Sequence, residues 1–243
     1  MDLINKHGQK IDHRFHEAPA PIDPKHVILI GHGVTGNLDR PSLKALAEGL
    51  AASGFHALRF SWSGNGASEG DFRESCISRE VEDLGSIIDV VTANGYTVSY
   101  AGHSMGGAVG TLRGAVDARL RYVISLAGMV ETAAFYEREF GSVTPDAGFM
   151  WDEPDFPLSS TFANDLRGIG STMAAGQKIM VPYLLLHGIQ DDLVPVEDAR
   201  AMFKSGAGVP GALVEIEGDH TFTGDATQTM VKEVIHWLKS HCT

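Results

Sequence analysis

Residues 97–109 read TVSYAGHSMGGAV, a short apolar stretch that leads through Gly102-His103-Ser104-Met105-Gly106 into a helical pattern. This is a G-x-S-x-G motif between a strand and a helix, the setting in which it carries chemistry. Only small residues fit two positions before and after a serine on such a strained turn. The turn lifts the hydroxyl above the strand and directs the helix N-terminus at any negative charge formed there. We therefore interpret Ser104 as a nucleophile rather than as a surface serine on a glycine turn.

A serine hydroxyl needs a general base, and the base needs an acid that orients it. With this motif the order along the chain is Ser, then Asp or Glu, then His. Two later apolar runs are followed by HGIQDDLVP, which holds Asp191 and Asp192, and by EGDH, which ends at His220. We predict His220 as the base, against the alternative that it only binds its neighbour Asp219. Spacing alone leaves Asp191 and Asp192 open as the acid.

Short apolar runs alternate with helical patterns over most of the chain, and several of the runs are typical of strands buried on both faces. The alternation predicts an α/β fold with a mostly parallel, doubly wound sheet and helices on both faces. We expect strands at 27–30, 55–60, 97–101, 121–126, 182–186 and 212–216, and helices at 43–53, 77–91, 108–116, 197–204 and 227–240. A turn at His7-Gly8 predicts an N-terminal hairpin within residues 3–18.

The stretch 128–176 departs from this alternation. It holds seven of the 19 aromatic residues and has a net charge of −6, half of the −12 of the whole chain. We interpret it as an insertion that lies over one end of the sheet. Its aromatic residues, among them Phe135, Tyr136 and Trp151, are candidates for an apolar substrate pocket or for the core of the insertion itself. Its acidic residues keep the surface solvated, disfavour anionic substrates or bind a substrate amine, and the sequence does not choose among these roles.

Composition excludes several classes of function. The 243 residues carry 31 acidic and 19 basic side chains and no basic run, so nucleic acid is not an expected partner. No run approaches the roughly 18 apolar residues of a membrane span, and the polar N-terminus lacks a signal-peptide pattern. The two cysteines, Cys76 and Cys242, belong to no CxxC motif and favour a reducing compartment, so we expect the cytoplasm. No cluster has metal-ligand spacing, so no metal is expected.

The sequence resembles the α/β-hydrolase superfamily over nearly its whole length. The matching stretches are His32-Gly33, the loop Gly64-Asn65-Gly66-x-Ser68, GHSMGG, HGIQDDLVP and GDH. The form HG-x-x-D-x-x-V-P that members share implies Asp191 as the acid. Asn65 stands where the loop usually has a histidine, at a position that is normally structural. Among subfamilies, HGVTGN and the compact body are similar to cinnamoyl and feruloyl esterases and to serine aminopeptidase-like hydrolases.

A tetrahedral intermediate places negative charge on one oxygen, which two backbone N–H groups should face. One is the N–H of Met105, directly after the nucleophile, and the resemblance implies Val34 as the other. We expect His32, His103 and His187, which stand beside glycines at strand ends, to be structural. The proposed chemistry needs neither a metal nor an organic cofactor.

The resemblance implies a single α/β-hydrolase domain, residues 1–243, with a cap inserted at about 128–176. We expect it to hydrolyse a carboxylic ester, with a small to medium acyl group or a hydroxycinnamoyl group, through an acyl-enzyme. The alternatives are an aminopeptidase-like peptidase, a monoacylglycerol lipase and a non-catalytic ligand-binding member of the superfamily. The expected partner is a small-molecule ester, and the sequence leaves a homodimer open.

Overall fold

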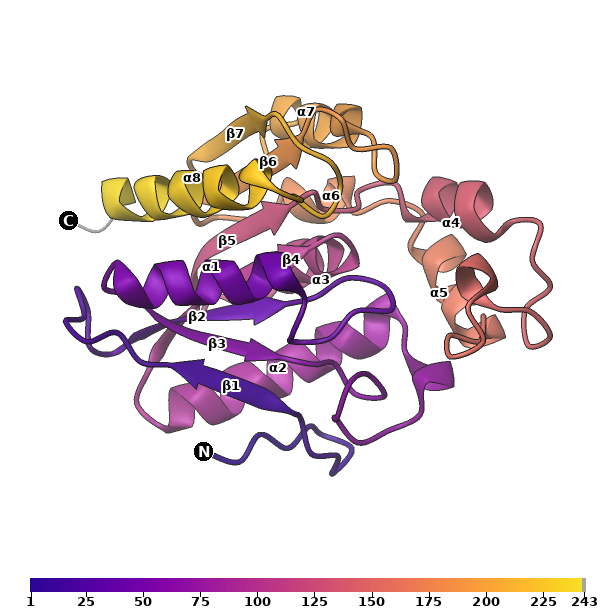
Figure 1. The fold of residues 1–243 in the computed structure, drawn as a ribbon, viewed down its shortest axis with the longest axis horizontal. Coiled ribbons are helices and arrows are strands. Elements are labelled where there is room, and N and C mark those ends of the chain that lie inside the picture. The colour runs from indigo at the N-terminus through magenta and orange to yellow at the C-terminus, as the bar shows by residue number, and fades with distance from the viewer. Residues whose placement is uncertain (242–243) are drawn as a thin grey trace.

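A seven-stranded sheet forms the centre of the molecule (Figure 1). The computed structural model describes residues 1–241, with strands β1 (His13–His16), β2 (His26–Gly31), β3 (His56–Phe60), β4 (Thr97–His103), β5 (Leu120–Leu126), β6 (Tyr183–Gly188) and β7 (Gly211–Ile216). Their order is β1-β3-β2-β4-β5-β6-β7. Strand β1 pairs antiparallel with β3, and every other neighbouring pair is parallel. The predicted α/β fold with a mostly parallel sheet is confirmed.

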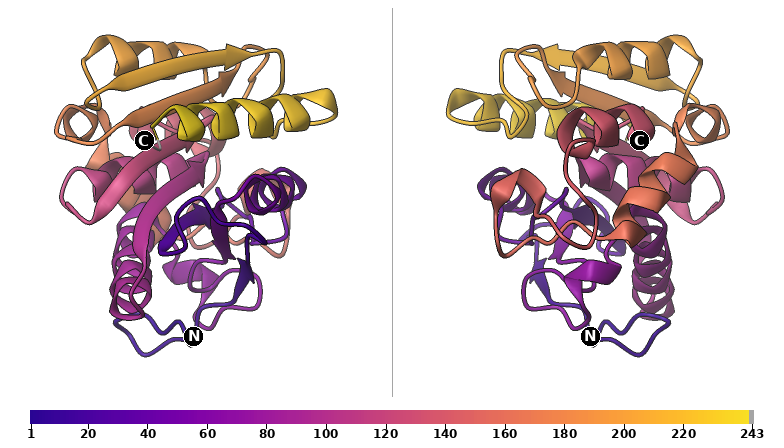
Figure 2. Two further views of the ribbon diagram at one scale, coloured as in Figure 1. Left: turned by 90° about the vertical axis from the view of Figure 1, so that its left-hand side faces the viewer. Right: turned by 90° about the vertical axis from the view of Figure 1, so that its right-hand side faces the viewer.

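Helices cover both faces of this sheet (Figures 1 and 2). On one face, α1 (Pro41–Ala52) and α8 (Asp225–His241) bury their apolar residues in a common cluster with the sheet. On the other face lie α2 (Ile77–Ala93), α3 (Met105–Gly114) and α7 (Val196–Lys204). A second cluster contains most apolar residues of α2 and α3 and, from α7, Met202. A sheet covered on both faces needs strands without a polar side, which is why the strands appear in the sequence as continuous apolar runs.

Strand β2 contributes apolar side chains to the clusters on both faces of the sheet. Val27 and Leu29 belong to the cluster around α2 and α3, whereas Ile28 and Ile30 belong to the cluster around α1 and α8. Successive side chains of a strand point to opposite faces of the sheet, so a strand in the middle of the sheet requires four apolar residues in a row here. All six residues of β2 are buried.

The N-terminal segment differs from the predicted hairpin. The turn at His7-Gly8 is present, but it joins only an isolated bridge between Ile4 and Lys10. The following residues form β1, which pairs with β3 at the edge of the large sheet. The physical reason is burial: Leu3 and Ile11 are fully buried in the main core, so both arms of the turn are anchored on the domain.

The stretch 128–176 consists of helices and connecting loops. It contains α4 (Thr132–Phe140), the 3₁₀ turn η2 (Met150–Asp152), α5 (Ser160–Ile169) and α6 (Met173–Gly176). Its helices α4 and α5 lie beyond the carboxyl ends of the parallel strands (Figure 1). The stretch also contacts the first half of the chain. The carboxylate of Asp165 accepts a hydrogen bond from the N–H of Ser78 at the start of α2, and the Phe156 ring lies 5.3 Å from that of Phe72 in the short 3₁₀ helix η1 (Phe72–Glu74).

Cys76 is buried directly before α2, and burial raises the pKa of its thiol to about 12. Such a thiol stays protonated at neutral pH and is a poor nucleophile. Cys242 lies outside the described residues. Within residues 1–241, no helix combines the length and the apolar character needed to cross a membrane.

Candidate active site

Ser104 occupies a strained turn between β4 and α3. Its backbone angles are φ 56° and ψ −120°, a region that costs a non-glycine residue about 1–3 kcal/mol. The two glycines of the motif make the turn possible. A side chain on Gly102 would overlap the carbonyl oxygen of Gly106, and a Cβ on Gly106 would lie 2.6 Å from the carbonyl oxygen of His32. The G-x-S-x-G spacing thus reflects contacts that leave no room for a Cβ.

Hydrogen bonds join three side chains from three different strand ends. The Oγ atom of Ser104, after β4, lies 2.9 Å from Nε2 of His220, which follows β7. The Nδ1 atom of that histidine lies 2.8 Å from Oδ2 of Asp191, which follows β6. Residues 116 positions apart in the sequence meet here, because parallel strands end at the same edge of the sheet. With the proton on Nδ1, the imidazole donates to the carboxylate and accepts from the serine hydroxyl.

Asp191, rather than Asp192, occupies the position next to the histidine. Its Oδ1 atom accepts the N–H groups of Leu193 at 2.9 Å and Val194 at 2.8 Å, and its side chain is fully buried. Burial alone would raise the pKa of Asp191, but hydrogen bonds from His187 and His220 outweigh it and hold the pKa well below the usual range. Asp192 is exposed.

His187 takes part in this cluster although it was expected only to support the fold. Its Nε2 atom lies 3.1 Å from Oδ2 of Asp191 and 2.9 Å from the carbonyl oxygen of Val194. The imidazole is 1% exposed. The sequence signal for this contact is the four-residue spacing between His187 and Asp191 in HGIQD. A single turn after β6 brings the aspartate back beside the histidine at the end of that strand.

Asp219 does not compete for the adjacent histidine. Its Oδ1 atom accepts the N–H groups of Thr221 at 3.1 Å and Thr223 at 2.9 Å, and its Oδ2 atom lies 2.5 Å from the Thr223 hydroxyl. These bonds close the loop that carries His220. The alternative in which His220 binds only Asp219 therefore does not describe the structure.

Two other histidines near the site lie inside the protein. Nε2 of His103 is 2.7 Å from the carbonyl oxygen of His220, and burial lowers the pKa of His103 to about 3. Nε2 of His32 accepts the N–H of Trp62 at 3.1 Å, and burial lowers the pKa of His32 to about 4. Both imidazoles are neutral at pH 7 and hold backbone segments that border Ser104.

The segment after β2 lies directly against the serine. A Cβ on Gly33 would be 2.7 Å from the Cβ of Ser104, so the backbone at this position comes as close as it can. Thr35 has a positive φ of 55°, which turns the chain sharply after Val34. The N–H groups of Val34 and Met105 donate to no acceptor within residues 1–241. Both predicted oxyanion donors are therefore free for a ligand.

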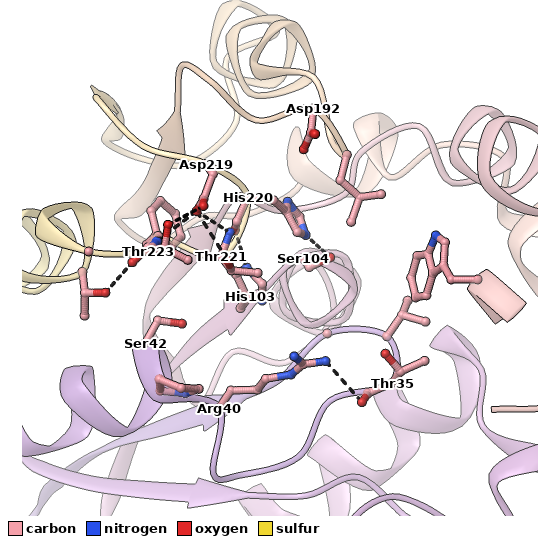
Figure 3. A pocket seen from close by; sticks show the side chains of 18 residues that line it. Thr35, Arg40, Ser42, His103, Ser104, Asp192, Asp219, His220, Thr221 and Thr223 are labelled. Atoms are coloured by element: carbon pink, nitrogen blue, oxygen red, sulfur yellow. Dashed lines mark hydrogen bonds between the residues drawn. The ribbon is translucent and has the colours of Figure 1, made fainter. Parts of the chain in front are cut away.

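A cavity of about 720 Å³ opens over Ser104 (Figure 3). Trp151 lines it, together with residues from the loops after β2 and β7. Phe135 and Tyr136 do not line it, because they lie on α4 among the buried residues of the core, 2% and 1% exposed. Of the three aromatic candidates, the structure thus brings only Trp151 to the cavity. A neighbouring cavity of about 680 Å³ shares Thr35, Arg40, Pro41 and Trp151 with the first.

No group of three or more histidine, cysteine, aspartate or glutamate side chains within residues 1–241 is arranged to hold a metal ion. The cavity is instead lined by hydroxyl, carboxylate, imidazole and apolar groups, with one guanidinium from Arg40.

A family model described as "Serine aminopeptidase, S33" matches residues 22–148. The chain belongs to this family of α/β hydrolases. The matched part spans β2 to β5 and includes the turn at Ser104, whereas Asp191 and His220 lie beyond it. No sequence among the curated proteins matches this α/β hydrolase.

Solved structures share the fold of this α/β hydrolase over nearly the whole chain. Est1E from Butyrivibrio proteoclasticus, solved with ferulic acid bound, superposes with a TM-score of 0.80 at 22% identity, over 99% of this chain and 98% of that chain. The esterase domain of a Rhodothermus marinus protein gives 0.74 at 20% identity, over 98% and 95%. Monoacylglycerol lipase from Paleococcus ferrophilus gives 0.74 at 18% identity, over 95% and 99%.

Proposed function

We propose that this α/β hydrolase cleaves carboxylic esters through an acyl-enzyme formed on Ser104. The observation that carries the proposal is the continuous hydrogen-bond chain from Ser104 through His220 to Asp191, with distances of 2.9 and 2.8 Å. A nucleophile in contact with a base, and a base in contact with an orienting acid, is the arrangement that acyl transfer requires.

In the first half of the reaction, Oγ of Ser104 attacks the ester carbonyl carbon while Nε2 of His220 takes the hydroxyl proton. The carbonyl π electrons move to oxygen, and the resulting oxyanion is held by the N–H groups of Val34 and Met105. The intermediate collapses when the C–O bond to the alcohol breaks and His220 gives its proton to the leaving oxygen. Water then repeats these steps on the acyl-enzyme, releasing the acid and restoring the serine hydroxyl.

Asp191 acts on His220 rather than on the substrate. It accepts the Nδ1 proton, so the other nitrogen is unprotonated and faces Ser104, and it stabilises the imidazolium that forms. Removal of the carboxylate from such a triad costs about 10⁴ in turnover in well-studied serine hydrolases. Loss of one oxyanion donor costs about 2.7–4 kcal/mol of transition-state stabilisation.

For the substrate, we propose a small to medium acyl ester, with a hydroxycinnamoyl ester as one case. The cavity volume of about 720 Å³ lies within the range of about 300–1,000 Å³ common for small-molecule sites. The similarity in fold to Est1E, whose structure has ferulic acid bound, supports the hydroxycinnamoyl case. In this reading the chain is one domain, residues 128–176 form a cap on it, and Trp151 supplies an apolar wall.

A substrate panel tests the proposal. Purified protein should hydrolyse p-nitrophenyl esters and methyl hydroxycinnamates faster than aminoacyl-arylamides, and Ser104→Ala should abolish both turnover and labelling by a fluorophosphonate. The family description makes peptidase activity the second candidate, which faster cleavage of the arylamides would support. An optimum at long acyl chains would instead support a monoacylglycerol lipase. If the wild-type protein showed neither turnover nor labelling, the result would support a non-catalytic, ligand-binding protein.

A further inference from the structure

The N-terminus of α1 borders the cavity that holds Ser104. Pro41 and Ser42, the first two residues of this helix, line the cavity, and so does Arg40, the residue before the helix. No side chain caps the helix, and its first turn contains no acidic residue. The N–H groups of Ser42 and Leu43 donate to no acceptor within the described part of the chain. The positive end of a 12-residue helix, with two unsatisfied amide donors, thus forms part of the cavity wall.

The side chain of Ser42 gives an independent indication that a ligand binds at this corner. The residue is only 7% exposed, yet its hydroxyl makes no hydrogen bond to any of residues 1–241. Figure 3 shows this hydroxyl directed into the cavity. Buried hydroxyl groups are normally hydrogen-bonded, so one that faces an open cavity without a protein partner is suited to a polar ligand.

Arg40 supplies a positive charge at the same corner. It is the only lysine or arginine among the residues that line either cavity. Its Nη2 atom donates to the carbonyl oxygen of Thr35 at 3.3 Å, and no ion pair to it is formed within residues 1–241. A guanidinium has five N–H donors in a planar fork, so most of the hydrogen-bonding capacity of Arg40 is free.

Four acidic side chains line the two cavities, namely Asp39, Glu153, Asp192 and Asp219, and none of them forms an ion pair with Arg40 within residues 1–241. Asp39 lines only the second cavity and contacts Arg59 at 3.3 Å. The carboxylate of Asp219 is occupied by Thr221 and Thr223, as described above. Asp192 lies on the opposite side of Ser104 in the view of Figure 3.

We propose that Arg40, Ser42 and the N-terminus of α1 form a carboxylate-binding subsite, so that the preferred substrates are esters that also carry a free carboxylate. This inference rests on the proposed ester hydrolysis, because the subsite shares its cavity with Ser104. A guanidinium fork binds a carboxylate through two parallel hydrogen bonds, and helix N-termini bind anions through their amides. Half-esters of dicarboxylic acids and esters of carboxylated phenols have the required chemistry.

Matched pairs of esters test the subsite. The acyl pair is p-nitrophenyl hemiglutarate and p-nitrophenyl pentanoate, and the alcohol pair is 4-carboxyphenyl acetate and 4-(methoxycarbonyl)phenyl acetate. In each pair, the ratio of kcat/KM for the charged ester to that for the neutral ester is compared between proteins, which cancels intrinsic reactivity. Arg40→Gln should lower this ratio at least tenfold in one pair, and Ser42→Ala at least threefold. The pair that responds identifies which part of the substrate carries the carboxylate.

Arg14→Gln is the control for bulk charge, because Arg14 is exposed on β1 and lines neither cavity. It should change the ratios less than twofold. Ratios that stay within twofold in Arg40→Gln and Ser42→Ala, while the neutral esters are hydrolysed, would overturn the subsite and leave the esterase proposal standing.

Binding without turnover separates the two proposals further. Calorimetric titration of monomethyl glutarate into the Ser104→Ala protein should give saturable binding that Arg40→Gln weakens at least tenfold. An equal dissociation constant with and without Arg40 would contradict the subsite even if the wild-type protein hydrolysed none of the esters.

Discussion

The Nε2 atom of His187 lies 3.1 Å from Oδ2 of Asp191, and the Nδ1 atom of His220 lies 2.8 Å from the same carboxylate oxygen. The Oδ2 atom of one aspartate thus lies against two imidazole groups, while its Oδ1 atom accepts two backbone N–H groups. Every hydrogen bond to an ionised carboxylate favours the charged form. His187 therefore helps to keep Asp191 charged and fixed in orientation, and we regard it as a positioning residue.

Replacing His187 should reduce turnover without touching the substrate. His187→Ala removes one hydrogen bond to a charged group, and we expect kcat to fall about tenfold with KM little changed, in line with the ~1.5–3 kcal/mol of such bonds. His187→Gln, which keeps an N–H donor, should recover most of the activity. A loss in kcat that Gln does not rescue would indicate a purely structural role.

The two adjacent aspartates should differ sharply. Asp191→Asn removes the carboxylate that holds the imidazole, and we expect ester turnover to fall about 10³-fold or more. Asp192→Asn should change it less than about threefold, since Asp192 is exposed and makes no contact with His220. Steady-state kinetics on one p-nitrophenyl ester measures both variants. Similar losses in the two variants would contradict the assignment of Asp191.

Stability should fall as the pH drops from 7 to 5, because buried histidines resist protonation. Burial lowers the pKa of His26 and His32 to about 4, and that of His103 to about 3. An unfolded-chain histidine has a pKa of about 6.5. Between these values the unfolded chain binds more protons than the folded chain, so the free energy of unfolding rises with pH. It therefore falls on acidification, by up to about 1.4 kcal/mol per pH unit for each histidine. Urea denaturation at several pH values measures this slope.

Replacing His26 tests whether buried histidines cause this pH dependence, because His26 lies away from Ser104. It stands at the start of β2, and its Nε2 atom lies 2.8 Å from Oγ of Ser99. In His26→Gln, the slope of the free energy of unfolding against pH should correspond to uptake of about one proton fewer on unfolding. A free energy of unfolding that is constant between pH 5 and 7 would contradict the prediction.

The close approach of Gly33 to Ser104 should make this glycine irreplaceable. In Gly33→Ala the added methyl group, 2.7 Å from the Cβ of Ser104, pushes the segment that carries the Val34 N–H away from the serine. We expect a loss of about 10²–10³ in kcat, the cost of one oxyanion donor. Gly168→Ala is the control, because a Cβ there meets nothing within 4 Å and the residue lies in α5. The control should keep full activity and gain up to about 1 kcal/mol of stability. Normal turnover in Gly33→Ala would show that Val34 is not a donor.

Much of the architecture could be predicted because local signals and global packing agree. The run 27–30 is apolar throughout since it is covered on both faces, and this pattern identifies a strand without reference to its neighbours. The tight turn at Ser104 likewise follows from the spacing of the glycines around it. The predicted helix 108–116 begins three residues after the observed start of α3, because glycines weaken the helical pattern of residues 105–107.

The residues that line the cavity and the pairing of β1 could not be predicted from the sequence, because they depend on how helices are rotated and how strands are joined. Phe135 and Trp151 are both aromatic residues of one segment, but only the second faces the cavity, since α4 turns its aromatic side into the core. The pairing of β1 with the sheet edge required knowledge of where Leu3 and Ile11 are buried. Arg40 and Ser42 carried no motif, and their common corner exists only because α1 begins at the cavity.

His220, the proposed base, follows β7, the least enclosed of the strands that end next to the cavity. Strand β7 is the edge of the sheet, is bonded only to β6, and is largely half-exposed, whereas Ser104 follows the fully enclosed centre. Segments with few buried apolar contacts open locally at free energies below that of global unfolding. On heating, the loop with His220 should therefore detach while the serine turn is still folded. Heat inactivation would then precede the loss of secondary structure and be reversed on cooling, so that enzymatic activity reports the integrity of one strand rather than of the whole domain.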